Sequence, residues 1–144
     1  YAAAFKSINE AWITEHFEIE ASDRLALDDP EGYIINRGGE ILFAIDDETS
    51  QVLGTCALIK TDQGQFELAK MGVTKSAQGR GIGKLLALAV VEKAKKMGAQ
   101  RIHLESNTRL APAMGLYRSI GFVRQPFPVA SDYSRADVYM EMSL

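Results

Sequence analysis

Gln78-Gly79-Arg80-Gly81-Ile82-Gly83 is the stretch of sequence that decides the fold of this chain. It lies between a run typical of a β-strand, residues 66–74, and a run typical of an α-helix, residues 82–97. A glycine-rich turn that leads into a helix leaves backbone N–H groups unpaired at the positive end of the helix dipole. The stretch therefore predicts a phosphate-binding site. Six apolar residues at helical spacing are expected on one side of the helix: Leu85, Leu86, Ala89, Val90, Ala94 and Met97.

The spacing of the glycines excludes two common phosphate loops. The dinucleotide-binding pattern G-x-G-x-x-G, begun at Gly79 and Gly81, requires a glycine where Lys84 stands. The P-loop requires a glycine at position 78 and a Ser or Thr in place of Leu85. The pattern that does fit is Q/R-x-x-G-x-G/A, which begins at Gln78.

This pattern resembles the pyrophosphate loop of the GCN5-related N-acetyltransferases (GNAT), which bind acetyl-CoA. The stretch Tyr117-Arg118-Ser119-Ile120-Gly121-Phe122 is similar to the Tyr-x-x-x-Gly-Phe of that family. The resemblance is specific from about residue 67 to residue 122. It implies an α/β fold with a mixed, mostly antiparallel central sheet, helices on both faces, and splayed parallel strands at the acetyl-CoA site.

The resemblance also implies which residues bind acetyl-CoA, the acyl donor. Main-chain amides of the loop would bind the pyrophosphate, the preceding strand would pair with the pantetheine arm, and Tyr117 would lie near the thioester sulfur. Many members carry an asparagine where this chain has Leu110, and Asn107 is the candidate that could replace it. The other expected binding residues are Met71, Gly72, Val73, Gln78, Gly79, Arg80, Gly81, Ile82, Gly83 and Lys84.

Acetyl transfer to an amine calls for a base and an acid, because an ammonium group has no lone pair and a leaving thiolate gains from a proton donor. Glu67 is the first candidate for the base, at the spacing from the loop that the histone-acetylating members show. Period-two alternation places it on one face with Ala69, Met71 and Val73, where apolar neighbours would raise its pKa. The alternative for Glu67 is an exposed strand carboxylate.

Glu105, on the neighbouring expected strand, is the rival for the base, although a structural carboxylate is also consistent with its position. Tyr117 is the candidate acid, with a packed core aromatic as the alternative. His103 and Cys56 are expected to be structural residues, and His16 to interact with the C-terminal end of the first helix. Two histidines and one cysteine far apart in sequence predict no metal site.

Composition predicts one domain that spans residues 1–144. The chain is 47% hydrophobic, has a net charge of −3 and contains one cysteine. The charge argues against nucleic acid as a partner. No apolar run approaches the ~20 residues of a membrane span, and no secretory signal is present. The chain is therefore expected in the cytoplasm, and a homodimer is left open.

The rest of the chain alternates between helices and strands. A helix is expected over residues 2–17, with Phe5, Ile8, Trp12 and Ile13 as its apolar stripe. A short helix and turn should follow, ending near Asp29-Pro30, and then a hairpin of residues 41–45 and 52–60. Further on come a strand at 101–107, a helix from 111, and a final strand at 137–144. Family members usually begin with a strand before the first helix, and here that strand is either trimmed or absent.

The predicted function is direct transfer of the acetyl group of acetyl-CoA to a primary amine of a small molecule or protein. The alternative is a non-catalytic module that binds or senses acyl-CoA. A general nucleotide-binding protein is disfavoured because both other loop patterns fail. The resemblance implies an acceptor site built from the N-terminal helices and the last hairpin, which here means residues 12–29 and 132–135. The acidic residues there would suit a polyamine, an aminoglycoside or a lysine side chain, and the alternative, the commoner case, is a solvated face: Glu15, Glu18, Glu20, Asp23, Asp28 and Asp29.

Overall fold

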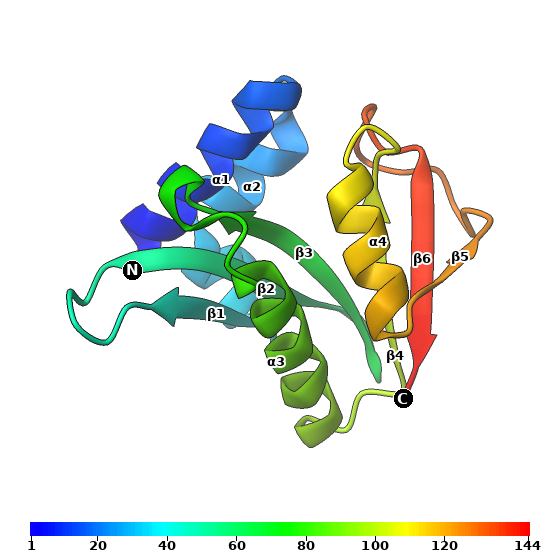
Figure 1. The fold of residues 1–144 in the computed structure, drawn as a ribbon. Coiled ribbons are helices and arrows are strands. Elements are labelled where there is room, and N and C mark those ends of the chain that lie inside the picture. Colours follow the sequence, from blue (N-terminus) through cyan, green and yellow to red (C-terminus); the bar gives the residue numbers. More distant parts are fainter.

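The computed structural model describes residues 1–144, and its centre is a six-stranded sheet in the order β1-β2-β3-β4-β6-β5 (Figure 1). Only β3 and β4 are parallel neighbours, and all the other pairs are antiparallel. The predicted mixed, mostly antiparallel sheet is therefore confirmed. The strands are β1 Glu40–Ile45, β2 Val52–Asp62, β3 Gln65–Val73, β4 Arg101–Ser106, β5 Val123–Gln125 and β6 Val138–Ser143.

Helices cover both faces of the sheet (Figure 1). On one face, α1 (Ala2–His16) and α2 (Ala21–Asp28) pack with a single π-helical turn, η1 (Glu31–Ile35), around a small apolar cluster. On the other face, α3 (Ile82–Lys96) and α4 (Ala111–Ile120) cover the larger cluster. The 3-10 turn η2 (Lys75–Ala77) connects β3 to the glycine loop. None of the helices is both long enough and apolar enough to span a membrane.

The expected apolar stripe of α1 is confirmed, but that of α3 is only half right. Leu86, Val90 and Ala94 are buried against the sheet as expected. Leu85, by contrast, is 65% exposed, and Ala89 and Met97 also face solvent. Each residue turns the helix by about 100°, so Leu85 and Ala87 lie on opposite sides of Leu86, and the buried face extends toward Ala87. The residues that complete it are Ile82, Ala87 and Val91.

A β-bulge in β3 overturns the expected alternation after Glu67. The pairing of β2 with β3 shifts between Thr55 and Ala57, and Lys70 has a φ of 53°. One extra residue in a strand reverses which face the following side chains occupy. The side chains of Phe66 and Leu68 therefore lie on the α3 face before the bulge, together with Met71 and Val73 after it. Glu67 and Ala69 lie on the other face, so Glu67 does not share a face with Met71 and Val73.

The parallel strands β3 and β4 pair over only three residues each, from Gln65↔Arg101 to Glu67↔His103. β3 continues to Val73 and β4 to Ser106, so the two strands separate beyond this point. The expected splayed parallel strands are present. The backbone groups that face the gap are free to bind another molecule, because no neighbouring strand takes them.

The short edge strand β5 was not predicted. Three exposed residues, Val123–Gln125, pair with β6 and carry no alternation of their own. Their strand conformation follows from the partner strand, a non-local cause that a local pattern does not contain.

Candidate active site

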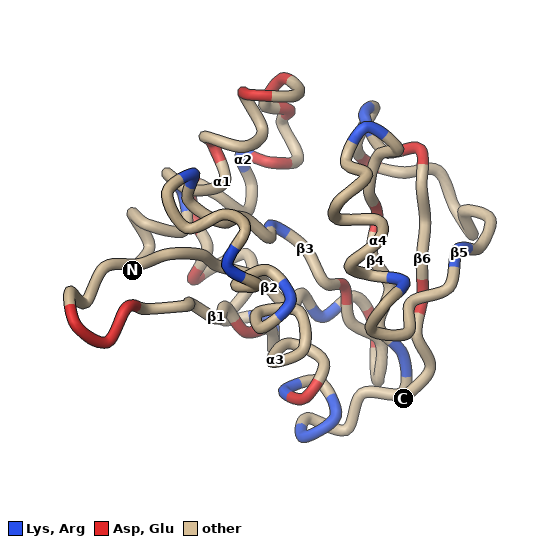
Figure 2. The backbone as a smooth tube through the Cα atoms, viewed as in Figure 1, with Lys and Arg blue, Asp and Glu red and all other residues tan.

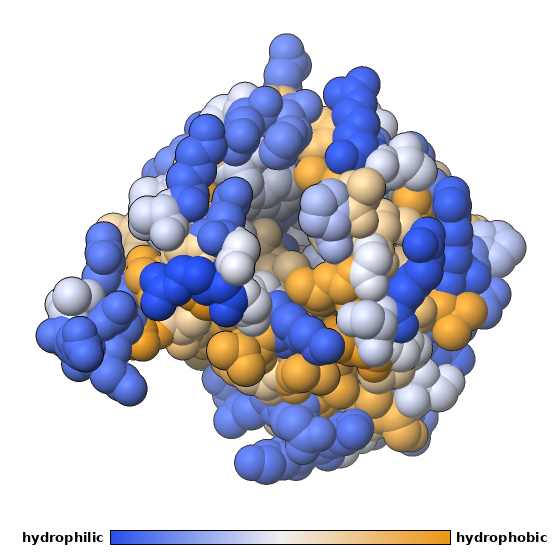
Figure 3. Space-filling model, viewed as in Figure 1, coloured by the Kyte–Doolittle hydropathy of each residue, from blue (hydrophilic) through white to orange (hydrophobic).

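A cavity of about 230 Å³ opens where β3 and β4 separate. Its walls come from the end of α1, the second half of β3, the end of β4, α4, and the loop at residues 133–136. In the space-filling view a hollow lies near the middle of the face that carries α3 and α4 (Figure 3). The sheet topology thus creates the cavity, and side chains far apart in the sequence line it.

The glycine loop is built to receive an anion. Gly79 and Gly81 have φ values of 78° and 76°, in the left-handed region that favours glycine. A Cβ atom at either position would have no heavy atom within 4 Å, so the backbone there is open. The first N–H bonded within α3 is that of Leu85, which donates to Gly81, and the amides of residues 79–84 have no backbone acceptor. Free amides at a helix N-terminus fit the pyrophosphate of acetyl-CoA.

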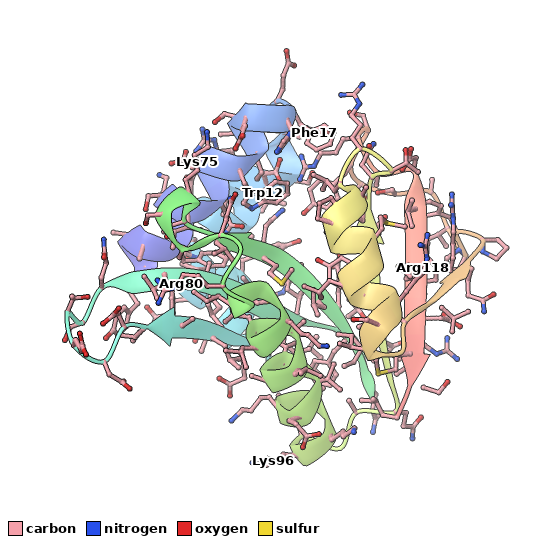
Figure 4. The ribbon with its side chains drawn as sticks, in the orientation of Figure 1. Trp12, Phe17, Lys75, Arg80, Lys96 and Arg118 are labelled. Atoms are coloured by element: carbon pink, nitrogen blue, oxygen red, sulfur yellow. The ribbon has the colours of Figure 1, made fainter.

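Six of the expected binding residues line the cavity: Met71, Gly72, Val73, Gln78, Asn107 and Tyr117. The remaining loop residues, 79–84, follow directly after Gln78 and continue from the cavity toward solvent. Arg80 and Lys75 extend from this side of the molecule in Figure 4. Gly72 has a separate structural role, since a Cβ there would come within 2.7 Å of Trp12 and 2.8 Å of Ile8 on α1.

Glu67 and Glu105 both line the cavity, one from each of the separating strands. The pKa of Glu67 is raised from 4.5 to about 7, mainly by burial and also by the negative charges of Glu105 and Asp132. Lys70 opposes this shift. A carboxyl group with a pKa near 7 suits a general base at neutral pH.

Tyr117 is buried on α4, with the edge of its ring against Phe122 at a centroid distance of 6.0 Å. Only one side-chain polar atom is both fully enclosed and without a hydrogen-bond partner, and it is Thr74 Oγ1, not the Tyr117 hydroxyl. The Tyr117 hydroxyl has no hydrogen-bond partner in the protein and is not fully enclosed, and the residue lines the cavity. Burial raises the pKa of Tyr117, so the hydroxyl stays protonated and available as a donor.

Asn107 shapes the cavity through the loop opposite. Its Nδ2 donates to the Arg135 carbonyl at 2.6 Å, and its Oδ1 accepts from the Arg109 amide at 2.8 Å. Leu110 also lines the cavity, without a polar group to contribute. The position where many family members carry asparagine is therefore apolar in this chain.

Two of the remaining candidates, His103 and Cys56, have surroundings typical of residues with a structural role. The His103 ring stacks on Tyr139 at 5.7 Å and lies outside the cavity wall, and burial lowers its pKa. Cys56 is fully buried, and burial raises the pKa of its thiol. A thiol in this state is a poor nucleophile. His16 does line the cavity, at the end of α1.

A buried ionic cluster borders the cavity, and the sequence analysis did not assemble it. Asp23, on α2, is 0% exposed. Its carboxylate accepts from Lys70 Nζ at 2.6 Å and from Arg135 Nη1 and Nη2 at 2.7 and 2.6 Å. Burial would raise the pKa of Asp23, but these hydrogen bonds outweigh it and hold the pKa at about 2. Tyr133 joins the cluster, since its hydroxyl is 2.9 Å from Lys70 Nζ.

Comparisons with known proteins agree with this geometry. Residues 3–122 match the acetyltransferase (GNAT) family. The uncharacterized N-acetyltransferase YvbK of Bacillus subtilis is 33% identical over 106 residues, which cover 72% of this chain and 67% of YvbK. The chain spans 41% and 26% of the length of two further curated relatives.

Solved structures show the same fold. An acetyltransferase of the GNAT family from Staphylococcus aureus has a TM-score of 0.87 at 22% identity and covers 99% of this chain and 92% of its own. A Bacillus subtilis acetyltransferase in complex with CoA has a TM-score of 0.67 at 25% identity, covering 88% of this chain and 95% of its own. The chain belongs to the GNAT family, whose members are acetyl-CoA-dependent acyltransferases.

Proposed function

We propose that this protein transfers the acetyl group of acetyl-CoA directly to a primary amine, with Glu67 as general base and Tyr117 as proton donor. The observation that carries the proposal is the single cavity that holds both side chains and continues into the open glycine loop. The solved relative that contains CoA supports the same donor for this chain.

Acetyl-CoA would bind with its pyrophosphate on the amides of residues 79–84. Its pantetheine arm would lie along the free edge of β3 from Met71 to Val73, where the strand has no parallel partner. This placement brings the thioester into the cavity toward Tyr117. The unpaired backbone groups of the gap then gain hydrogen-bond partners, which favours binding.

In the transfer step, the neutral amine attacks the thioester carbonyl carbon and forms the C–N bond. The amine proton passes to the Glu67 carboxylate, directly or through one water molecule. The C–S bond then breaks, and the thiolate of CoA leaves. The Tyr117 hydroxyl donates a hydrogen bond to that sulfur and lowers the energy of the departing charge. Full proton transfer from Tyr117 is less favourable than for an exposed tyrosine, because burial has raised its pKa.

Direct transfer is favoured over an acetyl-enzyme intermediate. The one cysteine is enclosed in the core, and its Sγ hydrogen-bonds to the carbonyl oxygens of Ala57 and Ala69, both at 3.8 Å. A two-step route through Cys56 would need an accessible thiolate.

Release of free CoA in the presence of a broad amine panel, with products read by mass spectrometry, tests the proposal. The expected result is CoA release that depends on the amine, with a product 42 mass units heavier than the acceptor, the mass of an added acetyl group in place of one hydrogen. Tight binding of acetyl-CoA without release on any amine would instead indicate a non-catalytic acyl-CoA-binding module.

A further inference from the structure

Two positively charged side chains, Lys70 and Arg135, line the cavity together with the proposed base, Glu67. Lys70 lies three residues after Glu67 on β3, and the bulge at Lys70 turns its side chain to the cavity face of the strand. Arg135, in the loop before β6, completes this part of the wall. The Tyr133 ring holds both in place, with Lys70 Nζ at 4.4 Å and Arg135 Cζ at 4.6 Å from its centroid.

Both cations keep donors that the protein does not use. The Lys70 ammonium has three N–H groups and donates to Asp23 and Tyr133. Arg135 has five N–H groups, and its contacts to Asp23 and Glu20 come from Nη1 and Nη2, so Nε is free. Arg135 Nε has no partner in the protein and is not fully enclosed, so it is open to a bound molecule. The Lys70 side chain is only 4% exposed, but it lines the cavity, so its third N–H can reach only a molecule bound against this wall.

The acidic residues that would attract a polycation are mostly engaged within the protein. Asp23 is enclosed behind Lys70 and Arg135. Glu20 accepts from the Ser134 amide at 2.9 Å. Asp28 pairs with Lys6 at 2.9 Å, Asp29 accepts from the Gly32 amide at 3.0 Å, and Glu15 lies 3.6 Å from Lys75. Figure 2 shows acidic positions along α1, α2 and the turn between them. A polyamine would place its second cation against Lys70 and Arg135.

The geometry points to an acceptor that carries a carboxylate as well as its amine. The amine is directed toward Glu67 and Glu105, and the carboxylate binds the spare donors of Lys70 and Arg135. Trp12 and Phe17, which lie on the side of α1 that faces α4 (Figure 4), form the apolar wall for the rest of the molecule. This inference rests on the proposed function and narrows its acceptor to small aminocarboxylates, the class that includes free amino acids.

Matched pairs of acceptors test the inference on the wild-type protein. Each aminocarboxylate, from glycine to 6-aminohexanoate and including a set of α-amino acids, is compared with its own carboxamide. The two have nearly the same size and differ in the charge of one group. Because a hydrogen bond to a charged group contributes about 1.5–3 kcal/mol, we expect kcat/KM to favour the best carboxylate by roughly tenfold to a hundredfold.

One variant, with a matched control and a fallback, locates the source of the preference. Lys70→Met should bring the carboxylate-to-carboxamide ratio of kcat/KM toward one. Arg109→Gln is the matched control: Arg109 also carries a positive charge near the cavity mouth, 5.7 Å above the Phe17 ring, but it is absent from the cavity wall. Its ratio should remain that of the wild type. If Lys70→Met does not fold, Arg135→Lys keeps the positive charge but loses the planar donors, and should reduce the ratio several-fold.

The failures of the inference and of the proposed function are distinguishable. If amines are acetylated but carboxylates and carboxamides react equally well, acetyl transfer stands and the carboxylate site is overturned. An unchanged ratio in Lys70→Met and Arg135→Lys would also overturn it. If acetyl-CoA binds and no amine is acetylated, the proposed function fails, and the acceptor class fails with it.

Discussion

Asp23 Oδ1 and Lys70 Nζ lie 2.6 Å apart in an ion pair whose side chains are 0% and 4% exposed. The pair connects α2 to the bulge of β3, across 47 positions of sequence. Lys70 is held there with a positive φ that a non-glycine residue rarely adopts. This backbone strain is offset because the buried Lys70 ammonium donates hydrogen bonds to both the Asp23 carboxylate and the Tyr133 hydroxyl.

The first prediction is that Asp23→Ala strongly destabilises the fold. Removing the carboxylate leaves Lys70 and Arg135 without their shared buried partner, and breaking a buried ion pair costs about 3–5 kcal/mol. We expect a fall of this size in the free energy of unfolding, measured by urea denaturation at pH 7.

Asp28→Ala is the matched control on the same helix. Asp28 also pairs with a lysine, Lys6, at 2.9 Å, but the side chains are 49% and 42% exposed. An exposed pair contributes about 0–1 kcal/mol. A loss of similar size in both variants would show that the buried cluster has no special role in stability.

The second prediction concerns the glycine loop. Gly81→Val should reduce acetyl-CoA affinity by about 10²-fold, because a branched side chain covers the amides and disfavours the left-handed backbone that presents them. Calorimetry measures the affinity. Gly98→Val is the control, since Gly98 has a φ of 79° and an equally open Cβ position just after α3, at the end away from the cavity.

Both glycine substitutions place Val in a left-handed conformation, which costs roughly 1–2 kcal/mol. Both variants should therefore lose similar stability, and only Gly81→Val should lose acetyl-CoA affinity. Equal affinity in the two variants would remove the loop from the binding site.

The features that sequence alone could predict are those encoded in neighbouring residues. The loop at 78–83 dictates a turn and a helix start through its own backbone freedom, and Tyr117 follows at a set distance along the chain. Glu67 was likewise predicted as a cavity residue, although for a partly wrong reason. Alternation placed it with Met71 and Val73, whereas the bulge places it on the opposite face, where it lines the cavity with Glu105.

The bulge and the buried cluster have causes that are distant in sequence. Lys70 follows Phe66 and Leu68 at even positions, where alternation predicts a core-facing side chain. A lysine at such a position was the available signal, because a buried ammonium needs a partner. The sequence does not identify that partner, since Asp23 lies on another helix and Arg135 in a distant loop.

The third prediction is that Tyr117→Phe slows turnover by about 10²-fold while acetyl-CoA affinity changes only a few-fold. The ring contact with Phe122 survives in the variant, and only the donor to the leaving sulfur is lost. Steady-state kinetics and calorimetry separate the two effects. Wild-type turnover in Tyr117→Phe would make this residue a packing group and leave protonation of the thiolate to solvent.

The fourth prediction is that Glu67→Gln removes the acidic limb of the pH–rate profile. With the pKa of Glu67 at about 7, the wild-type rate should fall about tenfold for each pH unit below that value. Gln keeps the size of the side chain but accepts no proton. The variant should be slower by about 10²-fold or more, and the limb should be absent. Glu105→Gln is the control: it removes a charge that raises the pKa of Glu67, so the limb should move to lower pH and persist.

Glu67→Gln lowers the rate, but it should raise the stability of the fold. The sign of this stability effect follows from the raised pKa of Glu67. The pKa of Glu67 is about 7 in the fold and 4.5 without its environment, so the folded state binds more protons between these values. The stability of the wild type therefore falls as pH rises from 4.5 to 7. Glu67→Gln should match the wild type at pH 4 and exceed it at pH 8, by at most about 3 kcal/mol. Thermal denaturation at the two pH values measures the difference. A wild type that loses no stability over this window relative to Glu67→Gln would mean that the fold does not raise the pKa of Glu67, as for an ordinary exposed carboxylate, and Glu105 would then be the better candidate for the base.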